Sequence, residues 1–302
     1  MPRFAPAATN SPMVEALLAW FAGAARDLPW RSRGEVFATP WAVLVSEIML
    51  QQTPVNRVLP TFREWIARWP TPAALAAATP GDAVRAWGRL GYPRRAIRLH
   101  AAAAVIAAHH NGDVPSDLAA LRALPGVGDY TAAAVAAFAF RQRHAVLDTN
   151  VRRVLARVIS GTATHGRGSV SAAERRIALE LLPDDGERAA TVSAALMELG
   201  ALVCQARAPS CTTCPLAVSC AWRRAGYPAS ELPARPAQTY VGTDRQARGA
   251  ILAVLRSRTA AVERAELRSG WADATQFDRA LDGLVFDRLV EPVDGDLFQL
   301  PG

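Results

Sequence analysis

All four cysteines of this 302-residue chain fall within 17 residues, at Cys204, Cys211, Cys214 and Cys220. Intervals of six, two and five residues separate them. Buried structural thiols would be scattered along the chain, and disulfides are unusual in a cytosolic protein of this size. The clustering therefore predicts a metal site that ties one long loop into a fixed shape.

Four thiolates can hold either one zinc ion or a [4Fe–4S] cluster. Zinc sites are typically built from two C-x2-C pairs, whereas only Cys211 and Cys214 form such a pair here. The other two cysteines approach singly, which fits a cubane with one thiolate on each iron. The spacing favours iron and leaves zinc open.

Apolar residues recur at intervals of three and four from Pro12 to about Arg224, which predicts an all-helical region without convincing strands. Ser, Thr, Asp or Pro stands at most segment starts. The expected helices are 12–25, 40–51, 54–68, 72–77, 81–87, 93–110, 116–122, 129–140, 150–159, 171–181 and 187–204.

A Pro-rich linker over 226–242 marks a domain boundary. Beyond it, helices over 246–257, 262–269 and 273–290 and a hairpin turn at Asp294-Gly295 predict a small winged-helix-like module. The third helix carries more carboxylates than arginines, with Asp278, Asp282 and Asp287 against Arg279 and Arg288. We therefore expect that helix to pack or to contact protein rather than to read a DNA groove.

The net charge is +7, and all 34 basic residues are arginine. Without a lysine, no side chain can form a Schiff base. Residues 243–302 sum to −2, which leaves +9 for residues 1–242, so a polyanion-binding surface is expected in the first part. No apolar run reaches transmembrane length and no signal peptide begins the chain, which predicts a cytosolic protein without membrane contact.

Two short segments could carry chemistry. In L-P-G-V-G, Gly126 and Gly128 allow a tight turn whose backbone N–H groups could cradle a phosphate, although many helix pairs turn on glycine. Asp148 precedes a helix, where an aspartate is usually only an N-cap. Arg152 and Arg153 after it could bind phosphate or form a solvated face.

Glu47 is the only ionisable residue in W-A-V-L-V-S-E-I-M-L, residues 41–50. Apolar neighbours would raise its pKa and keep a proton available near neutrality, unless the side chain occupies an exposed helix position.

Taken in order, these segments resemble the adenine DNA glycosylases, the MutY family, within the helix-hairpin-helix superfamily shared with endonuclease III. The matching motifs are L-P-W-R (28–31), S-E-I-M-L-Q-Q-T (46–53), L-G-Y (90–92), L-P-G-V-G (124–128), L-D-T-N-V-R-R-V (147–154), M-E-L-G-A-L-V-C (197–204) and the cysteine spacing. The resemblance implies a [4Fe–4S] cluster on the four cysteines and a DNA clamp at the hairpin.

The implied fold is all-α and bilobal. Residues 1–30 would join the cluster lobe over 139–225, a six-helix barrel would occupy 31–138, and the linker (226–242) and the winged-helix-like module (243–302) would follow. The implied partner is double-stranded DNA containing an adenine mispair, bent so that the base flips out. We expect a monomeric, cytoplasmic, nucleoid-associated enzyme of base excision repair that removes adenine opposite 8-oxoguanine or guanine.

By family correspondence, Glu47 protonates adenine N7 and Asp148 stabilises the oxocarbenium-like sugar, with Asn150 orienting water and Asp148. Tyr130 stands where lyase-active relatives have their Schiff-base lysine, which implies a monofunctional glycosylase. The resemblance also implies DNA contacts at Arg31, Gln52, Thr53, Leu90, Tyr92, Gly126, Gly128, Arg152 and Arg207, with Trp30 beside Arg31 in the adenine pocket.

The chain departs from the family at two places. Ala194 stands where many relatives have the Gln or Glu that reads the adenine edge, and the module is too short for the Nudix-like domain that recognises 8-oxoguanine. A thymine or uracil mismatch glycosylase is the nearest alternative, but pyrimidine excision has no N7 for Glu47 to protonate. A non-catalytic DNA-binding or redox-sensing protein would need neither Glu47 nor Asp148 in these motifs.

Overall fold

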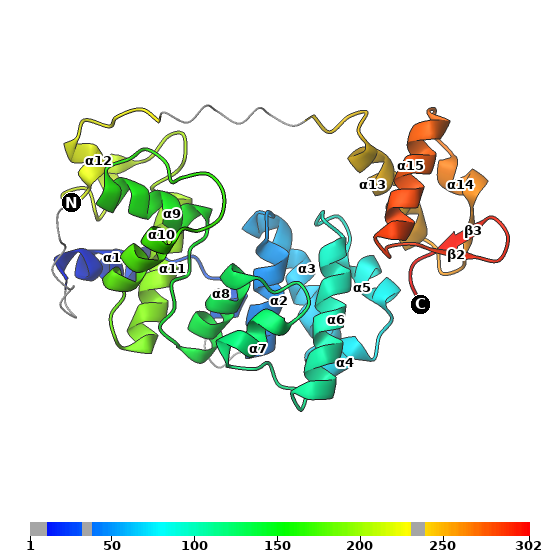
Figure 1. The fold of residues 1–302 in the computed structure, drawn as a ribbon, viewed down its shortest axis with the longest axis horizontal. Coiled ribbons are helices and arrows are strands. Elements are labelled where there is room, and N and C mark those ends of the chain that lie inside the picture. Colours follow the sequence, from blue (N-terminus) through cyan, green and yellow to red (C-terminus); the bar gives the residue numbers. More distant parts are fainter. Residues whose placement is uncertain (1–10, 32–37, 231–238) are drawn as a thin grey trace. The chain divides into compact units, whose positions relative to one another are not determined.

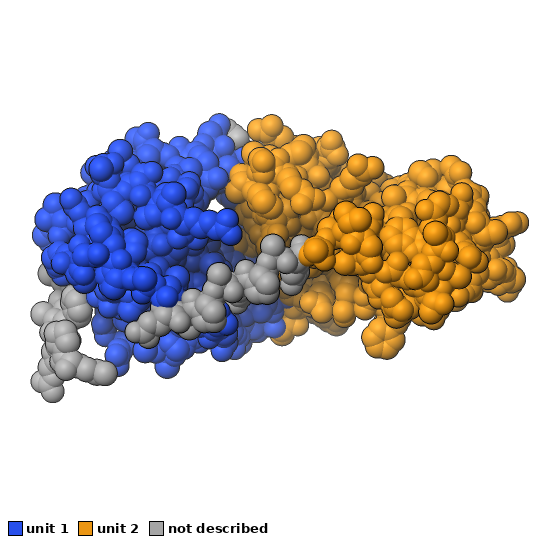
Figure 2. Space-filling model, turned by 90° about the horizontal axis from the view of Figure 1, so that it is seen from above, with its two compact units in different colours: residues 1–43, 116–122, 127–234 blue, residues 44–115, 123–126, 235–302 orange. Residues whose placement is uncertain are grey.

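The computed structural model describes residues 11–31, 38–230 and 239–302. Most of the loose N-terminus and much of the linker expected from the sequence lie outside these ranges. The chain divides into two compact units (Figure 2). Unit 1 comprises residues 1–43, 116–122 and 127–234, and unit 2 comprises residues 44–115, 123–126 and 235–302.

Unit 1 is helical and is built around its longest helix, α11 (Figure 1). Its apolar core includes Leu17, Val151, Val154, Leu196 and Leu199, contributed by α1, α9 and α11. The helices are α1 (Pro12–Ala24), α8 (Asp129–Phe140), α9 (Thr149–Leu155), α10 (Ala172–Leu181), α11 (Gly186–Leu202) and α12 (Ala221–Arg224), with short 3₁₀ turns at Pro29–Arg31 and Cys211–Thr213 and a π-helical continuation of α9 at Ala156–Ser160.

Helices α9 and α11 approach closely because α11 has a glycine at their contact. A Cβ on Gly200 would lie 2.6 Å from the Asn150 Cβ and 3.0 Å from the Asn150 carbonyl oxygen. Real Cβ atoms do not approach other heavy atoms so closely, so any larger residue would force the helices apart. This contact places the first turn of α9, where Asp148 is the N-cap, directly against α11.

Unit 2 contains a second set of helices around a tryptophan cluster. Trp65 contacts Trp69 and Trp87 edge-on, with ring centroids 4.7 and 5.5 Å apart. The helices are α3 (Val55–Arg68), α4 (Pro72–Ala76), α5 (Pro80–Trp87) and α6 (Arg94–His109), together with most of α2 (Pro40–Leu50). The division between the units falls within α2 and within α7 (Leu118–Ala123).

The C-terminal module also belongs to unit 2. Its elements run α13 (Asp244–Arg256), β1 (Val262–Glu263), α14 (Arg264–Arg268), α15 (Ala274–Phe286), β2 (Glu291–Val293) and β3 (Leu297–Gln299). The strands form an antiparallel sheet in the order β1-β3-β2, with Val262 opposite Phe298. The module is attached to α5, because Gly81 N donates to the Pro301 carbonyl at 2.7 Å and Arg256 Nε donates to the Val84 carbonyl at 3.1 Å.

The helical pattern read from the sequence is confirmed, with three corrections. The helix expected over 150–159 becomes π-helical at Ala156, and the one expected over 273–290 ends at Phe286. The segment expected as one helix over 262–269 is split into β1 and α14, because Val262 pairs with the C-terminal hairpin. No helix in the described ranges is long and apolar enough to span a bilayer.

Candidate active site and cysteine site

Asp148 is held rigidly at the start of α9. One carboxylate oxygen accepts from the Val151 amide at 2.7 Å, and the other accepts from Asn150 Nδ2 at 2.8 Å. Burial raises the pKa of Asp148 above its ordinary value, and these hydrogen bonds oppose the rise. The N-cap interpretation of this residue is correct, but the second bond leaves the carboxylate fixed in position by more than a cap requires.

A hydrogen-bonded chain connects Asp148 with the first cysteine. Asn150 Oδ1 accepts from Arg153 Nη2 at 2.8 Å, and the same nitrogen donates to the Gly200 carbonyl at 2.8 Å. Arg153 Nε donates to the Cys204 carbonyl at 2.8 Å. Arg153 is 8% exposed, so neither the phosphate contact nor the solvated face considered from the sequence is correct.

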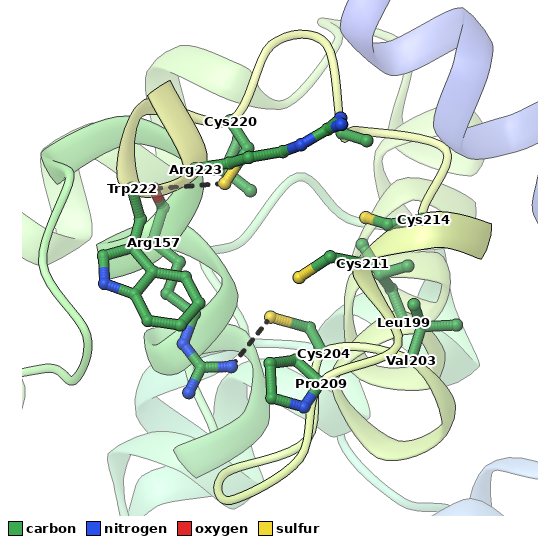
Figure 3. Close-up of a pocket in the computed structure, with 12 residues that line it drawn as sticks. Arg157, Leu199, Val203, Cys204, Pro209, Cys211, Cys214, Cys220, Trp222 and Arg223 are labelled. Carbon is green, nitrogen blue, oxygen red and sulfur yellow. Dashed lines mark hydrogen bonds between the residues drawn. The ribbon is translucent and has the colours of Figure 1, made fainter. Parts of the chain in front are cut away.

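The four cysteines line one cavity in unit 1, with their sulfurs turned toward it (Figure 3). Arg157 Nη1 donates to Cys204 Sγ at 3.4 Å, and its guanidinium carbon lies 4.5 Å from the Trp222 ring centroid. Burial, together with the neighbouring thiols, raises the pKa of Cys214 to about 11. Within the described ranges no group of three or more His, Cys, Asp or Glu side chains is arranged to hold a metal ion.

Two predicted DNA contacts of unit 1 differ in their surroundings. Arg152 is 9% exposed and forms an ion pair with Glu174 at 2.7 Å, while Nη1 donates to the Gly168 carbonyl at 2.9 Å. Its guanidinium therefore fixes the loop before α10 to α9, and the prediction of a DNA contact is corrected to this internal role. Arg207 is exposed in the loop between Cys204 and Cys211.

Arg31 and Glu198 form a second internal pair. Glu198, from the M-E-L-G segment of α11, is fully buried and accepts from Arg26 Nε at 2.6 Å and from Arg31 Nη2 at 3.1 Å. Burial raises the pKa of Glu198, but the Arg26 hydrogen bond and the Arg31 charge outweigh it and hold the pKa below its ordinary value. Trp30, the residue before Arg31, is buried. Ala194 of α11 is half-buried.

Tyr130 lies in the first turn of α8. It packs against a small apolar cluster that includes Ala134, Ala137 and Val146. The position expected to carry a lysine in lyase-active relatives is therefore occupied by a half-buried phenol ring.

Glu47 is 4% exposed, so the exposed helix position considered from the sequence is wrong. It lies on α2 among residues of which Ala42, Leu44 and Val45 have no exposed surface. Glu47 is thus a buried ionisable group in a helix whose other side chains are apolar except for the buried Ser46.

Arg95 of α6, which the sequence did not indicate, fixes the end of α2. Its Nη1 donates to the carbonyls of Ile48 at 2.9 Å, Met49 at 2.9 Å and Gln51 at 2.5 Å. Its Nη2 donates to Thr53 Oγ1 at 2.9 Å and to the Gly91 carbonyl at 3.0 Å. Burial lowers the pKa of Arg95 to about 10.

The residues expected to probe the opposite strand meet beside Arg95. Thr53 is buried and donates to the Leu90 carbonyl at 3.3 Å, so Q-Q-T and L-G-Y are joined. Leu90 is 4% exposed, whereas Gln52 is exposed and Tyr92 is 51% exposed. Gln52 and Tyr92 have φ values of 57° and 47°, a left-handed conformation that is costly for side-chain-bearing residues and is common at functional sites.

The two hairpin glycines serve different purposes. Gly126 has φ 80°, and a Cβ there would lie 2.8 Å from the Arg98 Cβ, so the turn requires glycine. Gly128 is the N-cap of α8, with an ordinary φ of −97° and nothing within 4 Å of a built Cβ. Its small size leaves the backbone at the start of α8 open to a ligand.

Comparison with known proteins identifies the family. A model described as "HhH-GPD superfamily base excision DNA repair protein" matches residues 45–177. The chain is 55% identical over 287 residues to the adenine DNA glycosylase of Mycobacterium tuberculosis, covering 95% of this chain and 92% of the relative. The chain belongs to the adenine DNA glycosylase family. The adenine DNA glycosylase of Mycolicibacterium smegmatis is 52% identical, with 95% of each chain covered.

A solved structure gives independent support for the helix-hairpin-helix glycosylase fold. A thermostable thymine-DNA glycosylase superposes with a TM-score of 0.63 at 27% identity, covering 70% of this chain and 95% of that one. The mycobacterial alignments extend over 95% of this chain, so they include most of the C-terminal module. The module is therefore shared with adenine DNA glycosylases of this group, although it lacks the size expected of a Nudix-like domain.

Proposed function

We propose that this chain is a monofunctional adenine DNA glycosylase of base excision repair, which hydrolyses the N-glycosidic bond of adenine paired with 8-oxoguanine or guanine. The observation that carries the proposal is the burial of Glu47, 4% exposed, in the segment matched to the glycosylase family. A buried carboxyl group beside a bound base is placed to act as a general acid. Excision of adenine needs such an acid at N7, and excision of thymine or uracil does not.

Glu47 acts as the general acid that protonates adenine N7 and weakens the bond between the base and the sugar. A positioned acid typically contributes about 10² to 10⁴ in rate. Arg95 holds the carbonyls at the end of α2 and thereby keeps the helix that carries Glu47 in place. Arg95 is thus a positioning residue for this step.

Asp148 stabilises the positive charge that develops on the sugar as the base departs. Its hydrogen bonds to Val151 and Asn150 fix the carboxylate, and Asn150 is fixed in turn by Arg153. With Tyr130 at the family's lysine position and no lysine in the chain, β-elimination through a Schiff base is absent. Water completes the reaction.

The DNA contacts of the proposed enzyme include the backbone of the hairpin at Gly126 and Gly128, the exposed side chains of Gln52 and Tyr92, and Arg207. Leu90 and Thr53 are buried, so they support the presentation of Gln52 and Tyr92. Arg31 lies beside the proposed adenine pocket, where its ion pair with Glu198 fixes its orientation.

The cofactor of the proposed enzyme is a [4Fe–4S] cluster held by Cys204, Cys211, Cys214 and Cys220. The residues fit this group because all four thiols line one cavity, and no carboxylate is among the described residues that line it. When bound, the cluster would tie the loop to α11 through four iron–thiolate bonds. Arg157 would donate to the thiolate of Cys204.

The wider assignments follow from the same proposal. The barrel would occupy residues 31–138, the cluster lobe 1–30 and 139–225, and the module after the linker would be winged-helix-like, which the order α13, β1, α14, α15, β2, β3 supports. The enzyme would act as a cytoplasmic, nucleoid-associated monomer on double-stranded DNA.

Single-turnover cleavage of four duplexes tests the proposal. Adenine opposite 8-oxoguanine, adenine opposite guanine, thymine opposite guanine and uracil opposite guanine are compared, with strand breakage by alkali as the readout. The variants are Glu47→Gln and, as a matched control, Glu64→Gln, which makes the same change on an exposed face of α3. Thermal unfolding of both variants establishes that they fold.

We expect breakage only at adenine, complete loss in Glu47→Gln and wild-type rates in Glu64→Gln. Cleavage at thymine or uracil would assign the chain to the mismatch glycosylases and make Ala194 the residue that changed the substrate. Full adenine release by a folded Glu47→Gln protein would remove the acid role.

A further inference from the structure

A large basic groove lies within unit 2, between the loops around α2 and α6 and the C-terminal module. Its volume is ≈ 1160 Å³. The cations that line it from the first segment are Arg57 of α3, Arg89 of the loop before α6, and Arg94, Arg95 and Arg98 of α6, and α13 contributes Arg245, Arg248 and Arg256. No aspartate or glutamate is among the described residues that line it. The groove therefore concentrates positive charge from two segments far apart in the sequence.

Some of these arginines are committed to the fold. Arg95 and Arg256 donate to backbone carbonyls, and Arg94 and Arg248 both contact Asp287, with Arg94 at 3.2 Å. The bond from Arg256 to Val84 and the pair of Arg94 with Asp287 hold the module against the helices of unit 2. They also neutralise part of the charge on the groove walls.

The remaining cations face solvent. Arg57, Arg89, Arg98 and Arg245 are exposed, and within the described part of the chain the side chains of Arg89 and Arg98 have no hydrogen bond or ion pair. Arg57 Nη2 donates to the Arg89 carbonyl, and Arg245 Nη2 donates to the Thr239 carbonyl at 3.0 Å. Exposed guanidinium groups along a groove are suited to successive phosphates of a nucleic acid backbone.

Aromatic and amide side chains line the same groove. Tyr92 is 51% exposed and Tyr240 is 50% exposed, and Trp271 and Gln52 complete the set. Aromatic rings that line a groove together with arginines can contact sugars and bases. Amide side chains can donate hydrogen bonds to base edges and accept hydrogen bonds from them. This combination favours a nucleic acid, in which phosphates and stacking bases recur together at every nucleotide, over an acidic peptide.

The module's negative total charge does not oppose this use. Its carboxylates Asp244 and Asp278 pair with Arg279 and Arg264, at 2.7 Å each, and neither carboxylate lines the groove. Among the arginines of α13 that line the groove, Arg248 pairs with Asp287 of the module, whereas Arg245 and Arg256 donate to backbone carbonyls. The helix of the module that lines the groove is its first helix, α13. The acidic helix for which the sequence argued against DNA contact is the third one, α15.

We infer that this groove binds the phosphate backbone of duplex DNA, and that α13 is the helix through which the C-terminal module contacts it. The bound strand is the one that carries the base opposite adenine, because Gln52 and Tyr92 line the groove. The identity of the strand rests on the proposed function, whereas backbone binding by α13 can be tested without catalysis.

The test is the salt dependence of binding by the full-length protein. A fluorescent duplex with only Watson–Crick pairs is titrated between about 50 and 200 mM salt, so that no adenine is released. Arg245→Gln removes the exposed cation of α13. Arg268→Gln is the matched control, since Arg268 is exposed on α14 and does not line the groove.

In a plot of the logarithm of the binding constant against the logarithm of the salt concentration, loss of one phosphate contact should reduce the magnitude of the slope by about 0.9. Raising the salt across this range should therefore weaken binding by Arg245→Gln less than binding by wild type, by a factor of about three to four. The combined Arg98→Gln and Arg245→Gln variant should lower the slope magnitude by about 1.8. Arg268→Gln should keep the wild-type slope.

Wild-type slopes in all three variants would overturn the inference and leave the groove to an acidic protein partner. An equal reduction in Arg245→Gln and Arg268→Gln would also overturn it, because the effect would then reflect net charge alone. Failure of the proposed function is distinguished separately, since it would appear as absence of adenine release by the wild-type enzyme whatever the slopes are.

Discussion

Replacing Gly200 with alanine should damage the active site from a distance through the contact between α9 and α11. The new Cβ would lie 2.6 Å from the Asn150 Cβ, 3.0 Å from its carbonyl oxygen and 3.1 Å from its carbonyl carbon. Two of these atoms are backbone, so a rotamer change cannot relieve the clash. Overpacking of this kind costs about 1–3 kcal/mol, against which alanine gains about 0.5–1 kcal/mol of helix propensity.

The net expectation is a loss of about 0–2.5 kcal/mol of unfolding free energy, or a few degrees of melting temperature. The catalytic effect should be larger than the effect on stability. Relief of the clash moves the first turn of α9, where Asn150 and Val151 hold the Asp148 carboxylate. A misplacement of about 1 Å can cost about 10²-fold in rate.

Gly23→Ala is the matched control, because Gly23 also lies near the C-terminal end of a helix and has nothing within 4 Å of a built Cβ. It should be neutral or slightly stabilising and should release adenine at the wild-type rate. Thermal unfolding and single-turnover adenine release are measured on both variants. If Gly200→Ala matched Gly23→Ala in both measurements, the argument from close helix approach would be refuted.

Three further predictions follow from the same contacts. Arg95→Met should lower the unfolding free energy, measured by urea denaturation, by about 2–5 kcal/mol, because several buried carbonyls lose their donor. The control Arg89→Met removes an exposed guanidinium and should change the unfolding free energy little. Burial opposes ionisation of Glu174, but the hydrogen bonds from Arg152 and Ser171 lower its pKa to about 2. The stabilisation that ionised Glu174 contributes is therefore present above the ordinary pKa of a glutamate and is lost as the pH falls toward 2. The difference in unfolding free energy between wild type and Glu174→Gln should narrow from about pH 6 to about pH 3. A difference that stays constant over this range would contradict the argument. The purified protein should be brown and contain iron and sulfide, and Cys214→Ser should lose both, whereas a colourless protein with stoichiometric zinc would contradict the cluster.

The sequence predicted most of the helices because the apolar periodicity was strong and the caps were local. Thr71, Thr79 and Ser171 each cap the helix that follows, with bonds that span only three residues. The strand β1 could not be recognised in the same way. It has two residues, Val262 and Glu263, and exists because it pairs with β3 more than thirty residues later.

The sequence also indicated the two carboxylates, since each lies in a distinctive motif. The cap bonds of Asp148 are local, but the arginines that support its neighbour Asn150 and the end of α2 act over long sequence separations, which the sequence did not indicate. Arg95 reaches carbonyls that lie 44 to 47 residues away, and Arg153 reaches one 51 residues away. Thirty-four arginines look alike in the sequence, and only their burial and acceptors separate Arg152 and Arg153 from the exposed Arg207.

The C-terminal module illustrates why a summed charge is a poor guide to a binding surface. Eight arginines and ten carboxylates give residues 243–302 a net charge of −2, from which contact with DNA seemed unfavourable. Electrostatic interactions with a polyanion fall off within about 10 Å at 0.1 M salt, so the charges that face the ligand decide the interaction. Arg245, Arg248 and Arg256 line the groove from one side of α13, because Arg245 and Arg256 are eleven residues, or about three helical turns, apart and Arg248 follows Arg245 by nearly one turn. The spacing of an amphipathic helix thus places three of the module's eight arginines along the groove, while no aspartate or glutamate is among the described residues that line it.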